Sequence, residues 1–140
     1  MRGYRGKVAV VGGAAGVGRA VGLFLASKGA KVAVVDGTED RANELAAEIR
    51  ARGGEARSWH FDPDGSEVDQ DQVFSQVCET FGGIDVLVQT GSLPDQPATR
   101  GRAARYLNKD GRIINLTPML RDGKGKTVYQ RAPRRRAAGE

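Results

Sequence analysis

The sequence predicts an α/β fold in which a parallel sheet of about five strands lies between two layers of helices. Short apolar runs rich in β-branched residues alternate along the chain with segments of helical periodicity, and this alternation is typical of parallel sheets. The runs at 8–11 and 32–35 are almost continuously apolar, as expected for strands covered on both faces. Right-handed crossovers then predict a doubly wound, Rossmann-like sheet in the order 3-2-1-4-5 with three α/β/α layers.

Apolar spacing and glycine stop signals define the individual elements. Apolar side chains recur at helical spacing in segments 39–52 and 67–81. Gly29, Gly53 and Gly82 follow the first three predicted helices, at the position where glycine commonly ends a helix. The predicted elements are, in order, strand 7–11, helix 17–28, strand 31–35, helix 39–52, strand 56–61, helix 67–81, strand 84–88, a short helix near 98–108 and strand 112–116.

A glycine-rich turn joins the first predicted strand to the first predicted helix. Gly12, Gly16 and Gly18 are spaced as GxxxGxG, and the GK[ST] ending of a P-loop is absent from this turn. Glycine lets the backbone approach a ligand closely, while the N–H groups and the positive dipole end of a helix attract anions. The turn therefore predicts a dinucleotide phosphate site that includes Gly12, Gly16, Val17 and Gly18, although a plain strand-to-helix turn is the alternative interpretation.

An acidic residue ends the second predicted strand. Asp36 lies about 20 residues beyond the glycine-rich turn, where a carboxylate binds the ribose hydroxyls of an NAD-type ligand. A carboxylate at this place also repels a 2′-phosphate. Alone, Asp36 would more simply be a turn residue beside Gly37 or a cap before Thr38. Together with the glycine-rich turn, it predicts NAD as the cofactor and makes NADP less favoured.

These residues resemble the short-chain dehydrogenase/reductase family, whose chains begin with a strand, a TGxxxGxG turn, a helix and a second strand that ends in an acid. The resemblance extends over roughly residues 6–118. It implies that Asp62 is the family's third-strand aspartate, which contacts adenine. It also implies that Thr90 and Gly91 belong to the cofactor-binding motif after the fourth strand, and that 111–116 is the strand before the catalytic serine.

The sequence departs from the family pattern at the reacting groups. Val11 stands in place of the motif threonine, and Gln-Thr-Gly-Ser at 89–92 replaces Asn-Asn-Ala-Gly. The family's serine would fall on Pro118, beside the hydroxyl group of Thr117. Tyr129 lies near the place of the catalytic tyrosine. The resemblance thus implies Thr117 and Tyr129 as candidate catalytic residues, while an ordinary tyrosine in a tail is the alternative for Tyr129.

The lysine of the family's YxxxK motif is replaced by Pro133. A tyrosine with a pKa of about 10 needs a nearby cation to exchange protons at neutral pH. Lys126 or Arg131 would have to supply that charge. The interval from 91 to 115 is also too short for the family's usual long helix, so the sequence corresponds mainly to the cofactor half of a family member.

Three functional hypotheses follow for this sequence. The first is an NAD(P)-dependent oxidoreductase acting on a small-molecule substrate of unknown class. The second is a nucleotide-binding partner subunit or sensor without turnover. The third is a biosynthetic enzyme that catalyses cyclisation, dehydration or isomerisation without hydride transfer, since one fold can carry different chemistries.

Composition and charge indicate one domain followed by a basic tail. The chain has 140 residues and is 39% hydrophobic, which fits a single dinucleotide-binding domain at 1–120. Residues 121–140 carry seven Lys/Arg and two Asp/Glu, and this net charge of +5 equals that of the whole chain. An arginine-rich segment could contact nucleic acid, an acidic partner or a cofactor phosphate. A flexible, solvated tail is the favoured interpretation and nucleic-acid binding is not expected.

The remaining composition excludes several other classes of protein. A single cysteine, an amino terminus without a signal-like apolar core and no 18-residue apolar run favour a cytoplasmic protein without a membrane span. One histidine and one cysteine provide no credible zinc site, so no metal is expected. The sheet should expose an apolar edge after its fifth strand, which favours a homo-oligomer, most simply a dimer.

Overall fold

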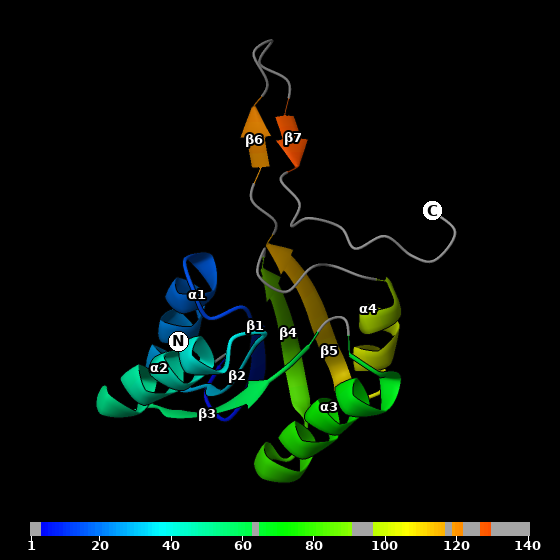
Figure 1. Cartoon of the computed structure of the whole chain (residues 1–140). Coiled ribbons are helices and arrows are strands. Elements are labelled where there is room, and N and C mark those ends of the chain that lie inside the picture. The colour runs from blue at the N-terminus through cyan, green and yellow to red at the C-terminus, as the bar shows by residue number, and fades with distance from the viewer. Residues whose placement is uncertain (1–3, 63–64, 91–96, 117–118, 122–126, 130–140) are drawn as a thin grey trace.

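The structure is a computed structural model that describes residues 4–62, 65–90, 97–116, 119–121 and 127–129. Its centre is a five-stranded sheet in the order β3-β2-β1-β4-β5, in which every neighbouring pair is parallel. The predicted fold class and strand order are therefore confirmed (Figure 1). The strands are β1 (Val8–Gly12), β2 (Lys31–Asp36), β3 (Glu55–His60), β4 (Ile84–Thr90) and β5 (Leu107–Leu116).

Four helices cover the two faces of this sheet, and alternate residues of each strand pack against them. Helices α1 (Val17–Ser27) and α2 (Glu39–Ala51) lie on one face, whereas α3 (Glu67–Phe81) and α4 (Pro97–Ala104) lie on the other (Figure 1). Burial on both faces explains the apolar strand sequences. The first core cluster contains Ala9, Val11, Val32, Val34, Leu25, Leu45 and Ile49, and the second contains Val8, Val10, Ala33, Val35, Phe74, Val77 and Ala103. None of the described helices is both long and apolar enough to cross a bilayer.

The connection from β4 through α4 to β5 differs most from the sequence prediction. Helix α4 ends at Ala104, four residues before the predicted end, and β5 begins at Leu107 instead of residue 112. The first half of β5 contains the exposed polar residues Asn108, Lys109 and Asp110, so its sequence does not show the alternation of a strand. Asp110 has a φ of 68° and the pairing with β4 shifts register here. The polar residues at the start of β5 therefore coincide with an irregular part of the strand, and their sequence is like that of a loop.

A second, two-stranded sheet follows the five-stranded one. Strands β6 (Met119–Arg121) and β7 (Thr127–Tyr129) are antiparallel neighbours and lie beyond the carboxyl end of β5 (Figure 1). The sequence analysis did not predict these strands, because each has only three residues and no clear alternation. Strand β7 falls within the segment expected to be a flexible tail, and the flexibility of that segment stays a prediction.

The aromatic packing beneath α3 gives a test of the core. The Phe74 ring is 1% exposed and its centroid lies 5.6 Å from that of Phe61 and 5.9 Å from that of Tyr106. Phe74→Ala should lower the free energy of unfolding by about 3–5 kcal/mol, because it leaves a cavity between helix and sheet. Val68→Ala is the control on the same helix, since Val68 is 66% exposed, and should change it by less than about 0.5 kcal/mol. Urea unfolding measures both, and equal losses would contradict this account of the core.

Candidate cofactor site

The glycine-rich turn lies at the carboxyl edge of the sheet, between the end of β1 and the start of α1. Gly13 and Gly16 have φ values of 104° and 55°, a region that favours glycine. The Gly13 amide donates a hydrogen bond to the Val35 carbonyl oxygen (2.8 Å), which ties the turn to the neighbouring strand. The turn is thus held by β2 as well as by its own glycines.

Gly18 brings the first turn of α1 directly against the glycine-rich turn. A Cβ atom at this position would lie 1.7 Å from the Gly13 carbonyl oxygen, so any side chain would force the two segments apart. At Gly16 a Cβ atom would meet no heavy atom of the described residues within 4 Å, which leaves space beside this part of the turn. Gly18 therefore sets the shape of the turn, and Gly16 leaves room for a ligand.

The amino end of α1 has the chemistry of an anion site. Its N-cap is Gly16, which has no side chain to cap the helix, and the first turn contains no acidic residue. The first residue of the helix, Val17, is exposed. The backbone N–H groups at the start of a helix carry partial positive charge and bind phosphate groups. A pyrophosphate therefore fits the residues present, and Gly12, Gly16, Val17 and Gly18 lie together at this edge.

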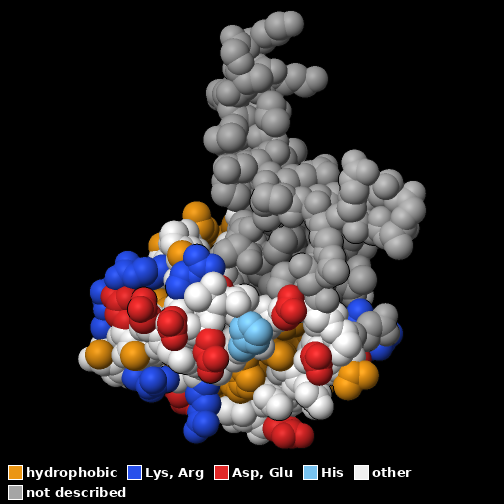
Figure 2. All heavy atoms as spheres, viewed as in Figure 1, with side chains coloured by type: hydrophobic (Ala, Val, Ile, Leu, Met, Phe, Trp, Pro, Cys, Tyr) orange, Lys and Arg blue, Asp and Glu red, His pale blue; other side chains and the backbone are white. Residues whose placement is uncertain are grey.

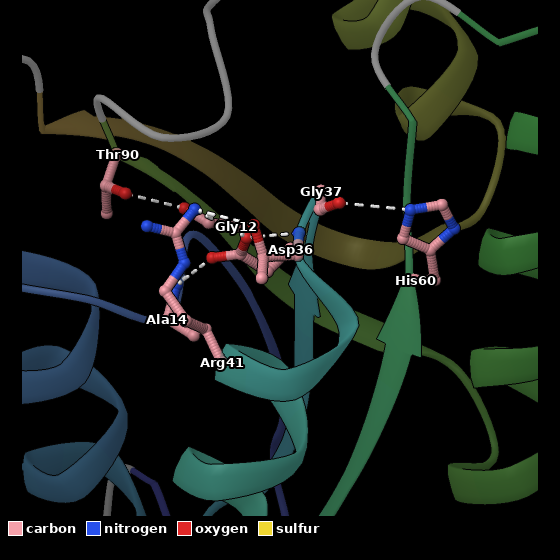
Figure 3. A network of polar contacts seen from close by, with 8 residues as sticks. Gly12, Ala14, Asp36, Gly37, Arg41, His60 and Thr90 are labelled. Carbon is pink, nitrogen blue, oxygen red and sulfur yellow. Dashed lines mark hydrogen bonds and ion pairs between the residues drawn. The ribbon is translucent and has the colours of Figure 1, made fainter.

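The carboxylate of Asp36 joins β2 to the glycine-rich turn (Figure 3). Its Oδ2 accepts a hydrogen bond from the Ala14 amide (2.8 Å), and its Oδ1 accepts one from the Thr38 amide (2.7 Å). The side chain is 0% exposed. Asp36 is the last residue of β2, and its side chain links the glycine-rich turn to the segment before α2. Its contact with ribose stays a prediction.

Arg41 on the first turns of α2 partly balances the buried charge of Asp36. One guanidinium nitrogen, Nη2, lies 3.3 Å from Asp36 Oδ1 and donates to Thr38 Oγ1 at 3.0 Å. The Arg41 side chain is 48% exposed. Arg41 was not predicted as a site residue. Its position five residues after Asp36 was a signal in the sequence that could have identified it.

Strand β4 supports the turn from the other side. Thr90 is buried and its hydroxyl group donates to the Gly12 carbonyl oxygen (2.7 Å; Figure 3). The adjacent Gln89 points to the opposite face of the sheet, because side chains alternate along a strand. It is fully buried, and neither atom of its carboxamide has a hydrogen-bond partner in the part of the chain that the structure describes. The predicted Thr90 therefore belongs to the site as a support of the turn.

The end of β3 closes the same edge of the sheet. Asp62 is exposed, and its carbonyl oxygen accepts hydrogen bonds from Gln70 Nε2 (3.1 Å) and the Gly65 amide (2.9 Å). The His60 ring donates from Nε2 to the Gly37 carbonyl oxygen (3.1 Å; Figure 3), which connects the ends of β2 and β3. These bonds fix the backbone of Asp62, whereas its contact with adenine stays a prediction.

Three further predicted site residues are Gly91, Thr117 and Tyr129. Gly91 and Thr117 lie outside the described residues. The backbone of Tyr129 ends β7, where it pairs with Met119. Their roles stay predictions. Over the described ranges, no group of three or more His, Cys, Asp or Glu side chains could hold a metal ion.

Comparison with known proteins decides the family. The family model described as short chain dehydrogenase matches residues 7–121 of this chain, a range that contains the turn, Asp36, Thr90 and all five strands of the parallel sheet. The chain belongs to the short-chain dehydrogenase family. The resemblance carried by the motifs is therefore confirmed, and NAD(P) is the cofactor class that this family binds.

Curated proteins similar to this chain include oxidoreductases that are much longer than it. An uncharacterized oxidoreductase of Thermotoga maritima is 34% identical over 91 residues, which cover 64% of this chain and 35% of that protein. The 2,3-dihydro-2,3-dihydroxybenzoate dehydrogenase of Bacillus subtilis is 32% identical over 93 residues, covering 66% of this chain and 35% of that enzyme. The chain thus spans about a third of the length of these relatives.

Solved structures show the same fold over most of the chain. A hydroxysteroid dehydrogenase from Escherichia coli superimposes with a TM-score of 0.69 at 26% identity, covering 81% of this chain and 56% of that one. A short chain dehydrogenase from Burkholderia cenocepacia, solved in complex with NADP, gives a TM-score of 0.68 at 28% identity. The match covers 82% of this chain and 56% of that one. The short-chain dehydrogenase fold is therefore shown.

The close approach at Gly18 predicts a large effect of one methyl group. Gly18→Ala should lower the free energy of unfolding by about 3 kcal/mol, because the new Cβ would overlap the Gly13 carbonyl and the turn must shift. Gly101→Ala is the control, since Gly101 lies within α4 and a Cβ there would meet no described atom within 4 Å. Gly101→Ala should leave the free energy of unfolding unchanged or raise it by up to about 1 kcal/mol. Urea unfolding tests both, and a stable Gly18→Ala protein would contradict the tight packing.

Proposed function

We propose that this chain binds a nicotinamide dinucleotide at the glycine-rich turn and acts as an oxidoreductase. The observation that carries the proposal is the turn itself, which Gly18, the Asp36 carboxylate and the Thr90 hydroxyl hold in one conformation at the start of α1. A rigid, glycine-rich cradle with an uncapped helix end is suited to a pyrophosphate group. The names of its relatives support the same class of activity.

Each part of the dinucleotide has a candidate partner in the chain. The backbone of the turn and of α1 would hold the pyrophosphate, Asp36 the ribose of the adenosine, and Asp62 the adenine ring. Thr90 would keep the first glycine in place. The bound nicotinamide supplies the group that takes or gives a hydride ion. Because Asp36 is an acid at the ribose, we propose that NAD binds more tightly than NADP.

The substrate chemistry would depend on hydroxyl groups near the end of the described chain. We propose that Thr117 and Tyr129 bind the reacting oxygen of a small alcohol or carbonyl compound, and that Lys126 or Arg131 provides the cation that Tyr129 needs. A hydroxyl pair and one cation are sufficient to move a proton at that oxygen.

A nucleotide-binding subunit without turnover is the second candidate. Two sequence observations favour it, because Pro118 and Pro133 stand where the family pattern has serine and lysine.

A homodimer is compatible with either candidate. In the described part of the chain, β5 pairs with β4 alone and Ile114 on it is exposed, so a second copy could cover this edge. Sedimentation equilibrium would give the mass of the assembly.

Cofactor binding is the first test of the proposal. Calorimetric titration should show that NADH binds more tightly than NADPH, because the Asp36 carboxylate accepts ribose hydroxyls and repels a 2′-phosphate. Asp36→Ala should weaken NADH binding about tenfold, since it removes the ribose acceptor and the anchor of Ala14. Asp40→Ala removes a nearby exposed carboxylate and serves as the control. Tight NADPH binding that Asp36→Ala leaves unchanged would overturn the cofactor assignment.

Turnover separates the two candidate functions. With NAD, the protein should oxidise at least one member of a panel of secondary alcohols. The absorbance of the reduced nicotinamide measures the rate. Tyr129→Phe should lower this rate at least about a hundredfold, because it removes the group that exchanges the proton. Tyr4→Phe is the matched control, since Tyr4 packs on Phe24 of α1. A Tyr129→Phe protein with full turnover would exclude that role, and NADH binding without any turnover would favour the second candidate.

A further inference from the structure

Positive and negative charges are segregated along the chain. Residues 1–35 contain six Lys/Arg and no Asp/Glu, whereas residues 36–120 contain nine Lys/Arg and fifteen Asp/Glu. Figure 2 shows acidic side chains gathered over α2 and α3, on both sides of the histidine. The basic side chains of the first segment therefore have no carboxylate near them in sequence, and their neighbours in space decide what they can bind.

An exposed aromatic ring lies beside one of these basic side chains. Phe24, near the end of α1, is 51% exposed. The Lys28 ammonium nitrogen lies 5.7 Å from the centroid of its ring, within the range of a cation–π contact. The Tyr4 ring meets Phe24 edge-on, with centroids 6.3 Å apart. Half of the Phe24 surface remains in solvent after both contacts are made.

The backbone holds a second cation next to this pair of rings. The Gly6 amide donates to the Gly29 carbonyl oxygen (3.1 Å), so that the segment before β1 lies against the end of α1. A Cβ atom at Gly29 would lie 3.1 Å from the Cα atom of Arg5. Arg5 is thus fixed beside the helix end that carries Lys28. We call Tyr4, Arg5, Phe24 and Lys28 the basic aromatic patch.

The two cations of the patch are available for a partner. Neither Arg5 nor Lys28 forms an ion pair with any residue that the structure describes, although other arginines of the same part of the chain do. Both side chains are exposed. The helix dipole favours a cation at the end of α1, which accounts for Lys28 alone. It does not account for Arg5 or for an exposed phenylalanine between the two charges.

The patch lies at the opposite end of α1 from the glycine-rich turn. Phe24 follows Val17, the first residue of the helix, by about 10 Å along the axis. Helix α1 begins at the carboxyl edge of the parallel sheet, so its last turn lies toward the amino edge. A partner bound at the patch would therefore leave the start of α1 open.

From these contacts we propose that the basic aromatic patch binds this chain to an anionic lipid surface. Exposed aromatic rings enter the boundary between headgroups and acyl chains, while lysine and arginine contact the anionic headgroups. A stacked nucleic-acid base would need an open face of the Phe24 ring, and Lys28 already occupies one face. Binding to the surface of a membrane requires no spanning helix. The inference goes beyond the proposed function, since it involves neither cofactor nor turnover.

Vesicle sedimentation with the full chain tests the ring. The protein should bind vesicles of phosphatidylcholine and phosphatidylserine in equal amounts, and should not bind vesicles of phosphatidylcholine alone. Phe24→Ala should weaken binding about tenfold, because the apolar contact with the lipid is lost. Val68→Ala is the matched control. It removes an apolar side chain that is 66% exposed on α3 and should leave binding unchanged.

Charge reversal tests the cations independently of the ring. Lys28→Glu should weaken binding to the mixed vesicles about twentyfold, since each charge near the surface contributes about a fivefold change. Arg57→Glu makes the same change of charge at an exposed position on the edge strand β3. It should alter binding by less than about threefold, because that position would face away from the lipid.

A third variant separates the patch from the arginine-rich end of the chain. Replacing Arg134, Arg135 and Arg136 by serine removes three positive charges from residues 121–140 and should leave most of the vesicle binding intact. Losses in Phe24→Ala and Lys28→Glu, with near-normal binding in the three controls, support the inference. Binding that the triple variant abolishes and Phe24→Ala leaves unchanged would place it at the chain end and overturn the inference. Equal losses in Lys28→Glu and Arg57→Glu would show attraction by net charge alone, and a wild type that ignores the mixed vesicles would also overturn it.

Discussion

The contact between Gly18 and the Gly13 carbonyl is the constraint from which the rest of the site follows. A separation that excludes even a Cβ atom places the start of α1 directly above the end of β1. In the same turn the Ala14 amide donates to Asp36 on β2, and the Gly12 carbonyl accepts from Thr90 on β4. The turn is therefore a junction of three strands and one helix, and its shape is fixed by backbone and buried side chains before any ligand binds.

The sequence predicts most of the fold because each buried strand is nearly all apolar. The segments 8–11 and 32–35 are typical of strands in a sheet covered on both faces, and the glycines after the first three helices marked the crossovers. Prediction was poorer where tertiary contacts override local pattern. The polar start of β5 is held by its pairing with β4, with Asp110 in a left-handed conformation, and no periodicity reveals such a strand. The short strands β6 and β7 carry equally little signal.

The site was predictable where it depends on backbone and unpredictable where it depends on side-chain partners. The GxxxGxG spacing identified the turn, because the glycines are needed for its shape. The same spacing could not show that Ala14 donates to Asp36, since that bond depends on how far β2 extends past β1. Nor could it show that Arg41 lies over Asp36, which depends on where α2 begins. The sequence indicated an acid at the ribose and left its charge environment undetermined.

Among the residues that the structure describes, the contacts that shape the cofactor site join positions 12–90. Gly18 to Gly13, Asp36 to Ala14 and Thr90 to Gly12 join elements of the first four strands, whereas the hydroxyl groups implied for chemistry stand at 117 and 129. None of these three contacts involves position 118 or 133. The residues that hold the turn and those implied for chemistry belong to different parts of the sequence, so binding and turnover must be measured as independent properties of this chain.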